Sequence, residues 1–288
     1  MAERFSDRLC AAIDRVGAPL CVGLDPVLER MPEDLDRSNP ASAFETFCAG
    51  IIDAVSGVAA AIKPQSACFE RYGSVGVAAL ERVIAKARDA GLVVVLDVKR
   101  GDIGLTASHY AAAAKSMGAD AVTVSPYMGT PSIDVAVAEG LGVFALVRTS
   151  NPEGDELQSV KVVDGATVAE KTAELVARAG GKAIGNAGLS DVGAVVGATK
   201  TDESAALRAI MPDQIFLVPG IGAQGGTVDQ LRPMLRPTAT DAATAGVLVT
   251  ASRSVIYAEP VQNESRPDAV RRAAEYVALD LRGLLGGS

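Results

Sequence analysis

The chain has 288 residues, of which 49% are hydrophobic and 22% are charged, so it can bury a sizeable core and is not a disordered chain. Its 35 acidic and 27 basic residues give a net charge of −8, which argues against a nucleic-acid binder that works through a general basic surface. Trp is absent and aromatic residues make up 4%, which argues against stacking platforms for single-stranded nucleic acid. A local basic pocket for an anionic ligand is compatible with these totals.

Short runs of apolar, often β-branched residues alternate with helical patterns along the whole chain. A helix is predicted near Phe5–Arg15, and eight strands follow it. These strands are predicted at Leu20–Asp25, Ala60–Gln65, Leu92–Lys99, Ala121–Ser125, Val143–Thr149, Val192–Thr199, Ile215–Pro219 and Gly246–Ala251. They are continuous apolar runs rather than strict alternations, as expected for a parallel sheet that is covered on both faces.

Between the strands, apolar residues recur every three or four positions, which is typical of helices with one buried face. One such face is predicted to consist of Phe44, Phe47, Ile51, Val55 and Val58. A C-terminal helix with Pro267 in its first turn is predicted to bury Val270, Ala274, Val277, Leu281 and Leu284. Eight βα units without a composition break predict an α/β protein, a single (β/α)₈ TIM barrel over residues 1–288 with an additional N-terminal helix. A doubly wound open sheet is the competing topology.

The cysteines and the N-terminus indicate the compartment. Four cysteines form no C-x-x-C pair, and His109 is the only histidine, so we expect buried free thiols rather than a zinc site or disulfides. The N-terminal sequence MAERFSDRL has charges where a signal peptide needs an apolar stretch, and the longest apolar runs, such as Leu92–Leu96, are too short to cross a bilayer. We therefore expect a cytoplasmic protein that binds neither membrane nor metal.

The third predicted strand carries charges where a buried strand should be apolar. It continues into the sequence LDVKRGDIGLT, in which Asp97 and Lys99 lie two residues apart and Asp102 follows just past the strand. Because alternate side chains of a strand share a face, Asp97 and Lys99 are predicted to point into the end of the barrel where catalytic groups lie. An isolated pair of this kind is more often a structural ion pair.

Two neighbouring strand ends favour a functional interpretation of these charges. The first strand ends in VGLDP, which contributes Asp25, and the second ends in AIKPQ, which contributes Lys63. Adjacent strand ends thus bring together charges of alternating sign. Since buried charges persist only when they are paired, such a network holds a lysine in its ammonium form, and a positioned ammonium is a proton donor.

A glycine cluster follows the seventh predicted strand, in the sequence PGIGAQGGT. Glycines let backbone N–H groups approach a ligand closely, and the N-terminus of the next helix favours an anion. The eighth strand leads into TASRS, where Arg253 supplies a forked donor matched to phosphate oxygens. Glycines alone fit plain turns as well, but these two strand ends commonly form the phosphate site of (β/α)₈ barrels.

The fifth predicted strand ends in LVRTSNP, a row of hydrogen-bonding groups that suits a planar polar ligand. An Asn-Pro turn explains the same residues equally well.

Together these motifs resemble orotidine 5′-phosphate decarboxylase. The segment from Asp97 to Thr106 is similar to that family's D-x-K-x-x-D signature, and GLDP, AIKPQ, PGIGAQGG and SRSVIY occur in the family's order. The matches run from Asp25 to Tyr257, and KRGDIG, PYMG and TSNPEG are similar to the branch of longer chains called type 2.

The resemblance implies a homodimeric (β/α)₈ barrel that converts orotidine 5′-monophosphate into uridine 5′-monophosphate and CO₂ without metal or organic cofactor, as the last step of pyrimidine nucleotide synthesis. It implies Lys99 as proton donor, Asp97 beside the departing carboxylate, Lys63 as anchor of the network and Asp25 at the ribose. The residues implied to reach the neighbouring subunit's site are Asp102, Ile103 and Thr106. Those implied to bind the pyrimidine ring or the phosphate are Ser150, Gln224 and Arg253, with Gly222 and Gly225 in the phosphate loop.

Two alternatives stay open. A sister enzyme of the same suprafamily, such as a sugar-phosphate decarboxylase or a hexulose-phosphate synthase, is similar in its Asp-x-Lys-x-x-Asp pattern but uses magnesium and further acidic ligands, where this chain has Lys63. A non-catalytic nucleotide-binding barrel is the other alternative, although a mere binder has little use for a buried lysine flanked by carboxylates.

Overall fold

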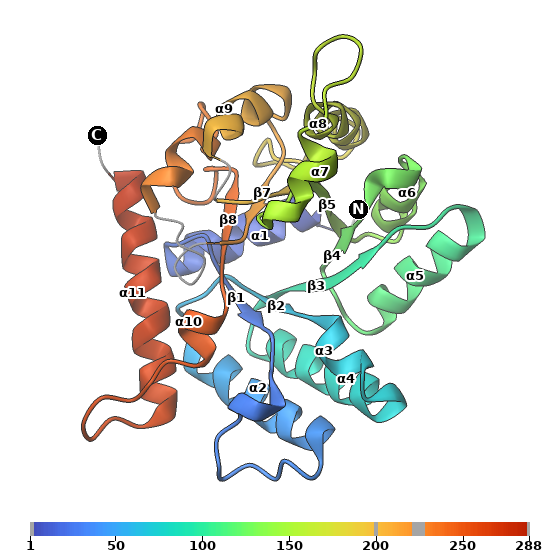
Figure 1. Ribbon diagram of the computed structural model, residues 1–288. Helices are drawn as coiled ribbons and strands as arrows, with labels where there is room; N and C mark the ends of the chain where they lie inside the picture. The colour runs from blue at the N-terminus through green and yellow to red at the C-terminus, as the bar shows by residue number, and fades with distance from the viewer. Residues whose placement is uncertain (1–2, 199–200, 221–227, 287–288) are drawn as a thin grey trace.

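Eight parallel strands form a closed barrel in the computed structural model, which describes residues 3–198, 201–220 and 228–286 (Figure 1). Each strand pairs with the next along the chain, and β8 pairs with β1. The strands are β1 (Leu20–Leu24), β2 (Ala61–Pro64), β3 (Val93–Arg100), β4 (Ala121–Val124), β5 (Gly142–Arg148), β6 (Val192–Val196), β7 (Phe216–Val218) and β8 (Val247–Ala251). This closed order confirms the predicted (β/α)₈ barrel and excludes the open sheet.

Helices connect the strands and surround the barrel (Figure 1). The longer ones are α2 (Pro40–Val55), α4 (Gly73–Asp89), α5 (Gly104–Ser116), α6 (Pro131–Ala138), α8 (Val168–Gly180), α9 (Thr201–Ile210) and α11 (Arg266–Gly286). Short helical segments after the strands are η1 (Leu28–Arg30), α3 (Ser66–Glu70), η2 (Pro126–Met128), η3 (Pro152–Gly154), α7 (Asp155–Gln158), η4 (Val228–Met234) and α10 (Arg253–Ile256).

The predicted N-terminal helix is α1 (Phe5–Val16), and it closes the N-terminal end of the barrel. Phe5 packs edge-to-face on Phe144 at 5.9 Å between ring centroids, and Gly142 leaves room for it, because a Cβ there would lie 2.1 Å from the Phe5 ring. The carboxylate of Asp191, just before β6, accepts hydrogen bonds from the backbone N–H and the hydroxyl of Ser6 at 2.9 and 2.8 Å. Because α1 fills this end of the barrel, we expect the functional site at the carboxyl ends of the strands.

Helix α2 is shorter than the periodicity predicts. It ends at Val55, because Ser56 leaves the helical conformation and Gly57 adopts a left-handed φ of +77°. Val58 is therefore not on the helix, although its side chain is buried in the same core. The C-terminal helix α11 has Pro267 in its first turn as predicted, and it buries Val270 and Leu281.

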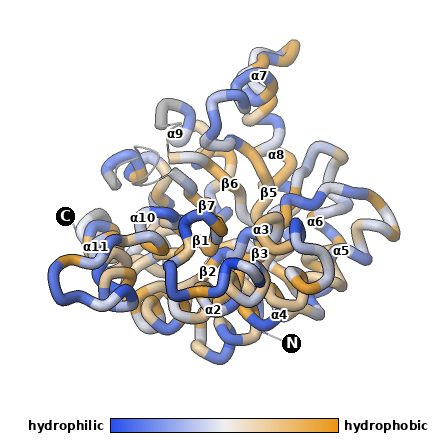
Figure 2. Tube along the Cα trace, turned by 60° about the horizontal axis from the view of Figure 1, so that its bottom comes forward, coloured by the Kyte–Doolittle hydropathy of each residue, from blue (hydrophilic) through white to orange (hydrophobic). Residues whose placement is uncertain are grey.

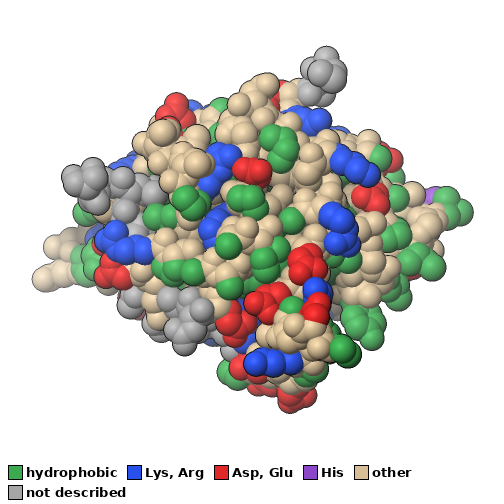
Figure 3. All heavy atoms as spheres, turned by 90° about the horizontal axis from the view of Figure 1, so that it is seen from above, with side chains coloured by type: hydrophobic (Ala, Val, Ile, Leu, Met, Phe, Trp, Pro, Cys, Tyr) green, Lys and Arg blue, Asp and Glu red, His purple; other side chains and the backbone are tan. Residues whose placement is uncertain are grey.

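The surface is mixed in charge and polarity. Apolar residues concentrate along the strands, whereas the connection between α10 and α11 is mainly hydrophilic (Figure 2). Acidic and basic side chains are interspersed on the face seen from above (Figure 3). None of the helices in the described ranges combines the length and the apolar character that a membrane span requires.

Candidate active site

The charged row predicted from the strand ends exists at the carboxyl ends of β2 and β3. Lys63 Nζ donates to Asp97 Oδ2 at 2.8 Å, and Lys99 Nζ donates to Asp97 Oδ1 at 2.6 Å. The side chains of Lys63 and Asp97 are 9% and 7% exposed, whereas that of Lys99 is 48% exposed. One carboxylate thus lies between a buried ammonium and an ammonium that opens to solvent.

Strand β3 is not regular where these charges lie. Its pairing with β4 shifts register between Leu96 and Arg100, and Lys99 has a left-handed φ of +46°. The backbone N–H groups of both Val98 and Lys99 donate to the same atom, Thr123 Oγ1, at 3.0 and 2.9 Å. Asp97 and Lys99 meet as predicted, but the cause is this bulge and not simple alternation.

Two polar residues that were not among the predicted site residues complete the surroundings of Asp97. Gln65 Nε2 donates to Asp97 Oδ2 at 3.1 Å, and the Thr123 hydroxyl donates to Asp97 Oδ1 at 2.8 Å. With the two lysines, this makes four donors around one carboxylate, which has about four acceptor positions. The signals available in the sequence are Gln65 in AIKPQ and the single threonine in the apolar run Ala121–Val124.

The opposite charges of this row keep its buried groups ionised, although burial disfavours the charged forms. Burial alone would raise the pKa of Asp97, but the charges of Lys63 and Lys99 and their hydrogen bonds outweigh it and hold that pKa well below its usual range. Burial alone would lower the pKa of Lys63, but the carboxylates of Asp97 and Asp25 raise it above the ordinary value. At neutral pH the buried pair is therefore fully ionised.

A pocket of about 360 Å³ opens above this row, within the range of about 300–1,000 Å³ that is typical of small-molecule sites. Its lining includes Lys63, Asp97, Lys99, Thr123, Leu146, Thr149, Ser150, Asn151, Val195, Leu217, Pro219 and Thr250. Ser150, predicted to contact the ligand, thus lies at the same pocket as the charged row. Gly197 permits this position, because a Cβ there would lie 2.7 Å from the Cα of Ser150.

The predicted row of ligand-binding groups after β5 divides into two parts. Arg148 does not line the pocket; its side chain is 2% exposed and its guanidinium pairs with Glu203 of α9 at 2.7 Å and with Asp155 of α7 at 2.6 Å. Thr149, the residue after Arg148, donates its backbone N–H to the Gln158 side chain at 2.9 Å. Arg148 therefore anchors the segment that presents Ser150, and the expectation that the whole row faces a ligand was wrong for this residue.

Two of the other predicted residues follow strands at the same end of the barrel, and the remaining three lie outside the described residues. Asp25 is half-buried at the end of β1, and Arg253 is exposed at the start of α10. The predicted phosphate-binding residues Gln224, Gly222 and Gly225 lie outside the described residues.

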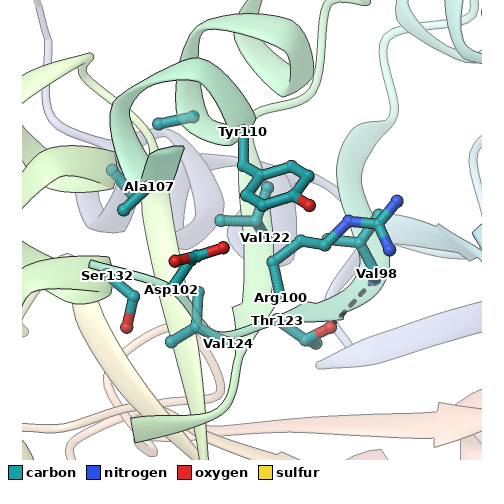
Figure 4. A pocket seen from close by; sticks show the side chains of 11 residues that line it. Val98, Arg100, Asp102, Ala107, Tyr110, Val122, Thr123, Val124 and Ser132 are labelled. Carbon is teal, nitrogen blue, oxygen red and sulfur yellow. Dashed lines mark hydrogen bonds between the residues drawn. The ribbon is translucent and has the colours of Figure 1, made fainter. Parts of the chain in front are cut away.

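The predicted intersubunit residues do not join the charged row within one chain. Asp102 accepts the backbone N–H of Ile103 at 2.9 Å, and its side chain lines a small separate cavity with Arg100, Tyr110 and other residues (Figure 4). Ile103 and Thr106 are exposed at the start of α5. The structure thus places Asp102 in a cavity beside α5 and leaves the other two side chains exposed.

The cysteines are free, and three of them, Cys10, Cys21 and Cys48, are buried, whereas Cys68 is half-buried. Burial raises the pKa of Cys10 to about 11 and that of Cys21 to about 12, so these thiols are protonated at neutral pH. Within the described part of the chain, no cluster of His, Cys, Asp and Glu side chains has the arrangement of a metal site.

Comparison with known proteins identifies the family of the chain. The family model described as "Orotidine 5'-phosphate decarboxylase / HUMPS family" matches residues 18–267. Orotidine 5′-phosphate decarboxylase of Rhodopirellula baltica is 42% identical in a match that covers 97% of this chain and 99% of the relative. The enzyme of the same name from Salinispora tropica is 41% identical in a match that covers 99% of this chain and 100% of the relative. The structure of Leishmania donovani OMP decarboxylase superposes with a TM-score of 0.77 and 34% identity, covering 99% of this chain and 100% of that one. The chain therefore belongs to the orotidine 5′-phosphate decarboxylase / HUMPS family.

Proposed function

We propose that the protein is a carboxy-lyase that converts orotidine 5′-monophosphate into uridine 5′-monophosphate and CO₂, the last step of pyrimidine nucleotide synthesis. The observation that carries the proposal is the row of Lys63, Asp97 and Lys99, which ends in a half-exposed ammonium at a pocket of nucleotide size. The curated relatives with this name, matched over nearly their whole length, support it.

The chemistry requires a group that stabilises a carbanion and then protonates it. When the bond between pyrimidine C6 and the carboxylate breaks, its electron pair stays on C6 and CO₂ leaves. The ammonium of Lys99 lowers the energy of that charge and then transfers a proton to C6, which leaves a neutral amine that solvent reprotonates. Asp97 orients the ammonium of Lys99 through the 2.6 Å hydrogen bond.

The substrate phosphate is expected to bind far from the reacting carbon. Arg253, at the start of α10, and the glycine loop with Gln224, Gly222 and Gly225 are proposed to hold it. Ser150 is proposed to bind the pyrimidine ring and Asp25 the ribose. Binding energy from these remote groups would favour the transition state by excluding water from the ring.

A magnesium-dependent sugar-phosphate decarboxylase or synthase is the second candidate within this family. The contacts of Asp97 disfavour it, because its four neighbouring donors include two ammonium groups. A divalent cation bound there would have to displace at least one donor and would be repelled by Lys63 and Lys99.

One assay separates the candidates. Purified protein in chelator-treated buffer is mixed with orotidine 5′-monophosphate, and the loss of substrate absorbance and the release of CO₂ are followed. We expect full turnover without added metal. Turnover that disappears on chelation and returns with magnesium would favour the second candidate, and nucleotide binding without CO₂ release would indicate a non-catalytic barrel.

We further propose that the enzyme is a homodimer in which Asp102, Ile103 and Thr106 of each subunit reach the site of the other. Exposed apolar side chains on two consecutive βα connections support this arrangement. These side chains are Ile103, Leu105, Tyr127 and Met128. The cytoplasmic location expected from the sequence stays a prediction.

Complementation between two inactive variants tests the shared site. Lys99→Ala and Asp102→Ala proteins are each expected to be inactive alone. A dimer with one subunit of each kind has one native site, so random co-assembly should restore about one quarter of wild-type activity. If Asp102 acts within its own subunit, the mixture stays inactive, and a sedimentation measurement shows whether dimers form at all.

A further inference from the structure

We propose that Thr123 of β4 is a positioning residue that holds the proton donor Lys99 against Asp97. This inference rests on the proposed decarboxylase function, because it assigns Thr123 a role in the orientation of Lys99. Thr123 lies on a different strand from both residues, and its side chain is buried.

The hydroxyl of Thr123 uses all of its hydrogen-bonding capacity inside the protein. A threonine hydroxyl has one donor and two acceptor positions. Its hydrogen goes to Asp97 Oδ1 at 2.8 Å, and its oxygen accepts the backbone N–H groups of Val98 and Lys99 at 3.0 and 2.9 Å. Figure 4 shows the contact with Val98. No capacity is left for a ligand, so the hydroxyl acts on the protein and not on the substrate.

These contacts account for the unusual backbone of Lys99. Two consecutive N–H groups of a regular strand point in opposite directions and cannot reach one atom. They reach Thr123 Oγ1 because β3 bulges between Leu96 and Arg100, with φ of +46° at Lys99. A residue with a β-carbon persists in this conformation only when its surroundings fix it, and the two N–H contacts do so.

The same hydroxyl also fixes the partner of the ammonium. Asp97 Oδ1 accepts from Thr123 and from Lys99 Nζ, so the bonds of Thr123 determine both the backbone that carries Lys99 and the carboxylate oxygen that Lys99 binds. Without the hydroxyl, the segment around Lys99 is free to return to an extended conformation. The ammonium would then move away from the pocket, and a donor displaced by about 1 Å can lose about 10²-fold in rate.

Three substitutions separate the hydroxyl from the volume of the side chain. Thr123→Val keeps the shape of the side chain and removes its three hydrogen bonds, whereas Thr123→Ser keeps the hydroxyl. Thr123→Ala removes the hydroxyl and leaves a smaller side chain. Thr172→Val in α8 is the matched control, because the bond described for its hydroxyl is a local one, to the carbonyl of Val168 in the same helix. The steady-state kcat and KM, the affinity for uridine 5′-monophosphate and the unfolding temperature are measured for each.

We expect Thr123→Val to lower kcat about 100-fold, while KM and nucleotide affinity change less than about threefold. Thr123→Ser should have a kcat within about threefold of that of the wild type. A Thr123→Val protein with wild-type kcat, or a Thr123→Ser protein as slow as Thr123→Val, would overturn the inference. If Thr123→Val does not fold, Thr123→Ala is judged by the same criteria. Wild-type protein that releases no CO₂ would instead refute the proposed function.

Discussion

Replacement of Lys99 by alanine is expected to lower kcat for decarboxylation by at least about 10⁴-fold, because it removes both the proton donor and the charge that stabilises the carbanion. The lysine side chain is half-exposed and ends at the pocket, so its loss should leave the fold intact. Uridine 5′-monophosphate should still bind within about tenfold of wild-type affinity, because the proposed partners of its phosphate and ribose are other residues. Calorimetry and a CO₂-release assay measure the two quantities separately.

The control for this variant is Lys182→Ala. Lys182 is exposed between α8 and β6, at the opposite end of the barrel from the pocket, and its loss should leave kcat unchanged. A Lys99→Ala protein with kcat near that of Lys182→Ala would refute the assigned proton donor.

Replacement of Asp97 by asparagine is expected to reduce stability as well as activity. It removes the anion between two cations and leaves Lys63 buried beside an uncharged amide. Loss of one partner of a buried ion pair typically costs about 3–5 kcal/mol in the free energy of unfolding. The kcat should fall by about 10³-fold, since a neutral amide with one acceptor oxygen cannot hold both ammonium groups and orients Lys99 less firmly. Urea unfolding at pH 7 and steady-state kinetics test both effects.

The stabilisation that Asp97 provides is expected to depend on pH in a definite direction. The pKa of Asp97 is lowered in the folded protein, so its stabilisation is fully present above the unfolded-state pKa of about 3.9 and is lost as pH falls towards the folded value. The difference in unfolding free energy between wild type and Asp97→Asn should therefore be constant near neutral pH and shrink below about pH 4. Asp229→Asn, at an exposed ion pair with Arg232, should change little at any pH. Equal stabilities at pH 7 would contradict the importance of the buried row.

The barrel and the charged residues were predictable because their signals are local. A strand buried on both faces is a continuous apolar run, and Lys63 and Asp97 stand out within such runs as charges that must be paired to be buried. Because both residues lie near the carboxyl ends of consecutive predicted strands, they could be placed at the same end of the barrel.

The contacts of Thr123 and Arg148 were not predictable in the same way. Threonine is common in strands, so one threonine in an apolar run gives no sign of a hydroxyl with three bonds. Arg148 follows a register shift between β5 and β6, so counting alternate residues does not give its direction. Its partner Glu203 is 55 residues away in sequence, and the pairing of β5 with β6 brings α9, which follows β6, close to the end of β5.

The four described donors to the Asp97 carboxylate come from β2, the residue directly after it, β3 and β4, whereas much of the remaining pocket wall comes from β5 to β8 and the segments after them. These two arcs of the barrel meet across the pocket, and the described ion pairs of Asp97 do not cross between them. Mutations in the second arc can therefore alter the shape and polarity of the wall while the charged row keeps its contacts. A lineage with this architecture is free to vary the molecule it recognises gradually, without rebuilding the groups that carry out the bond cleavage.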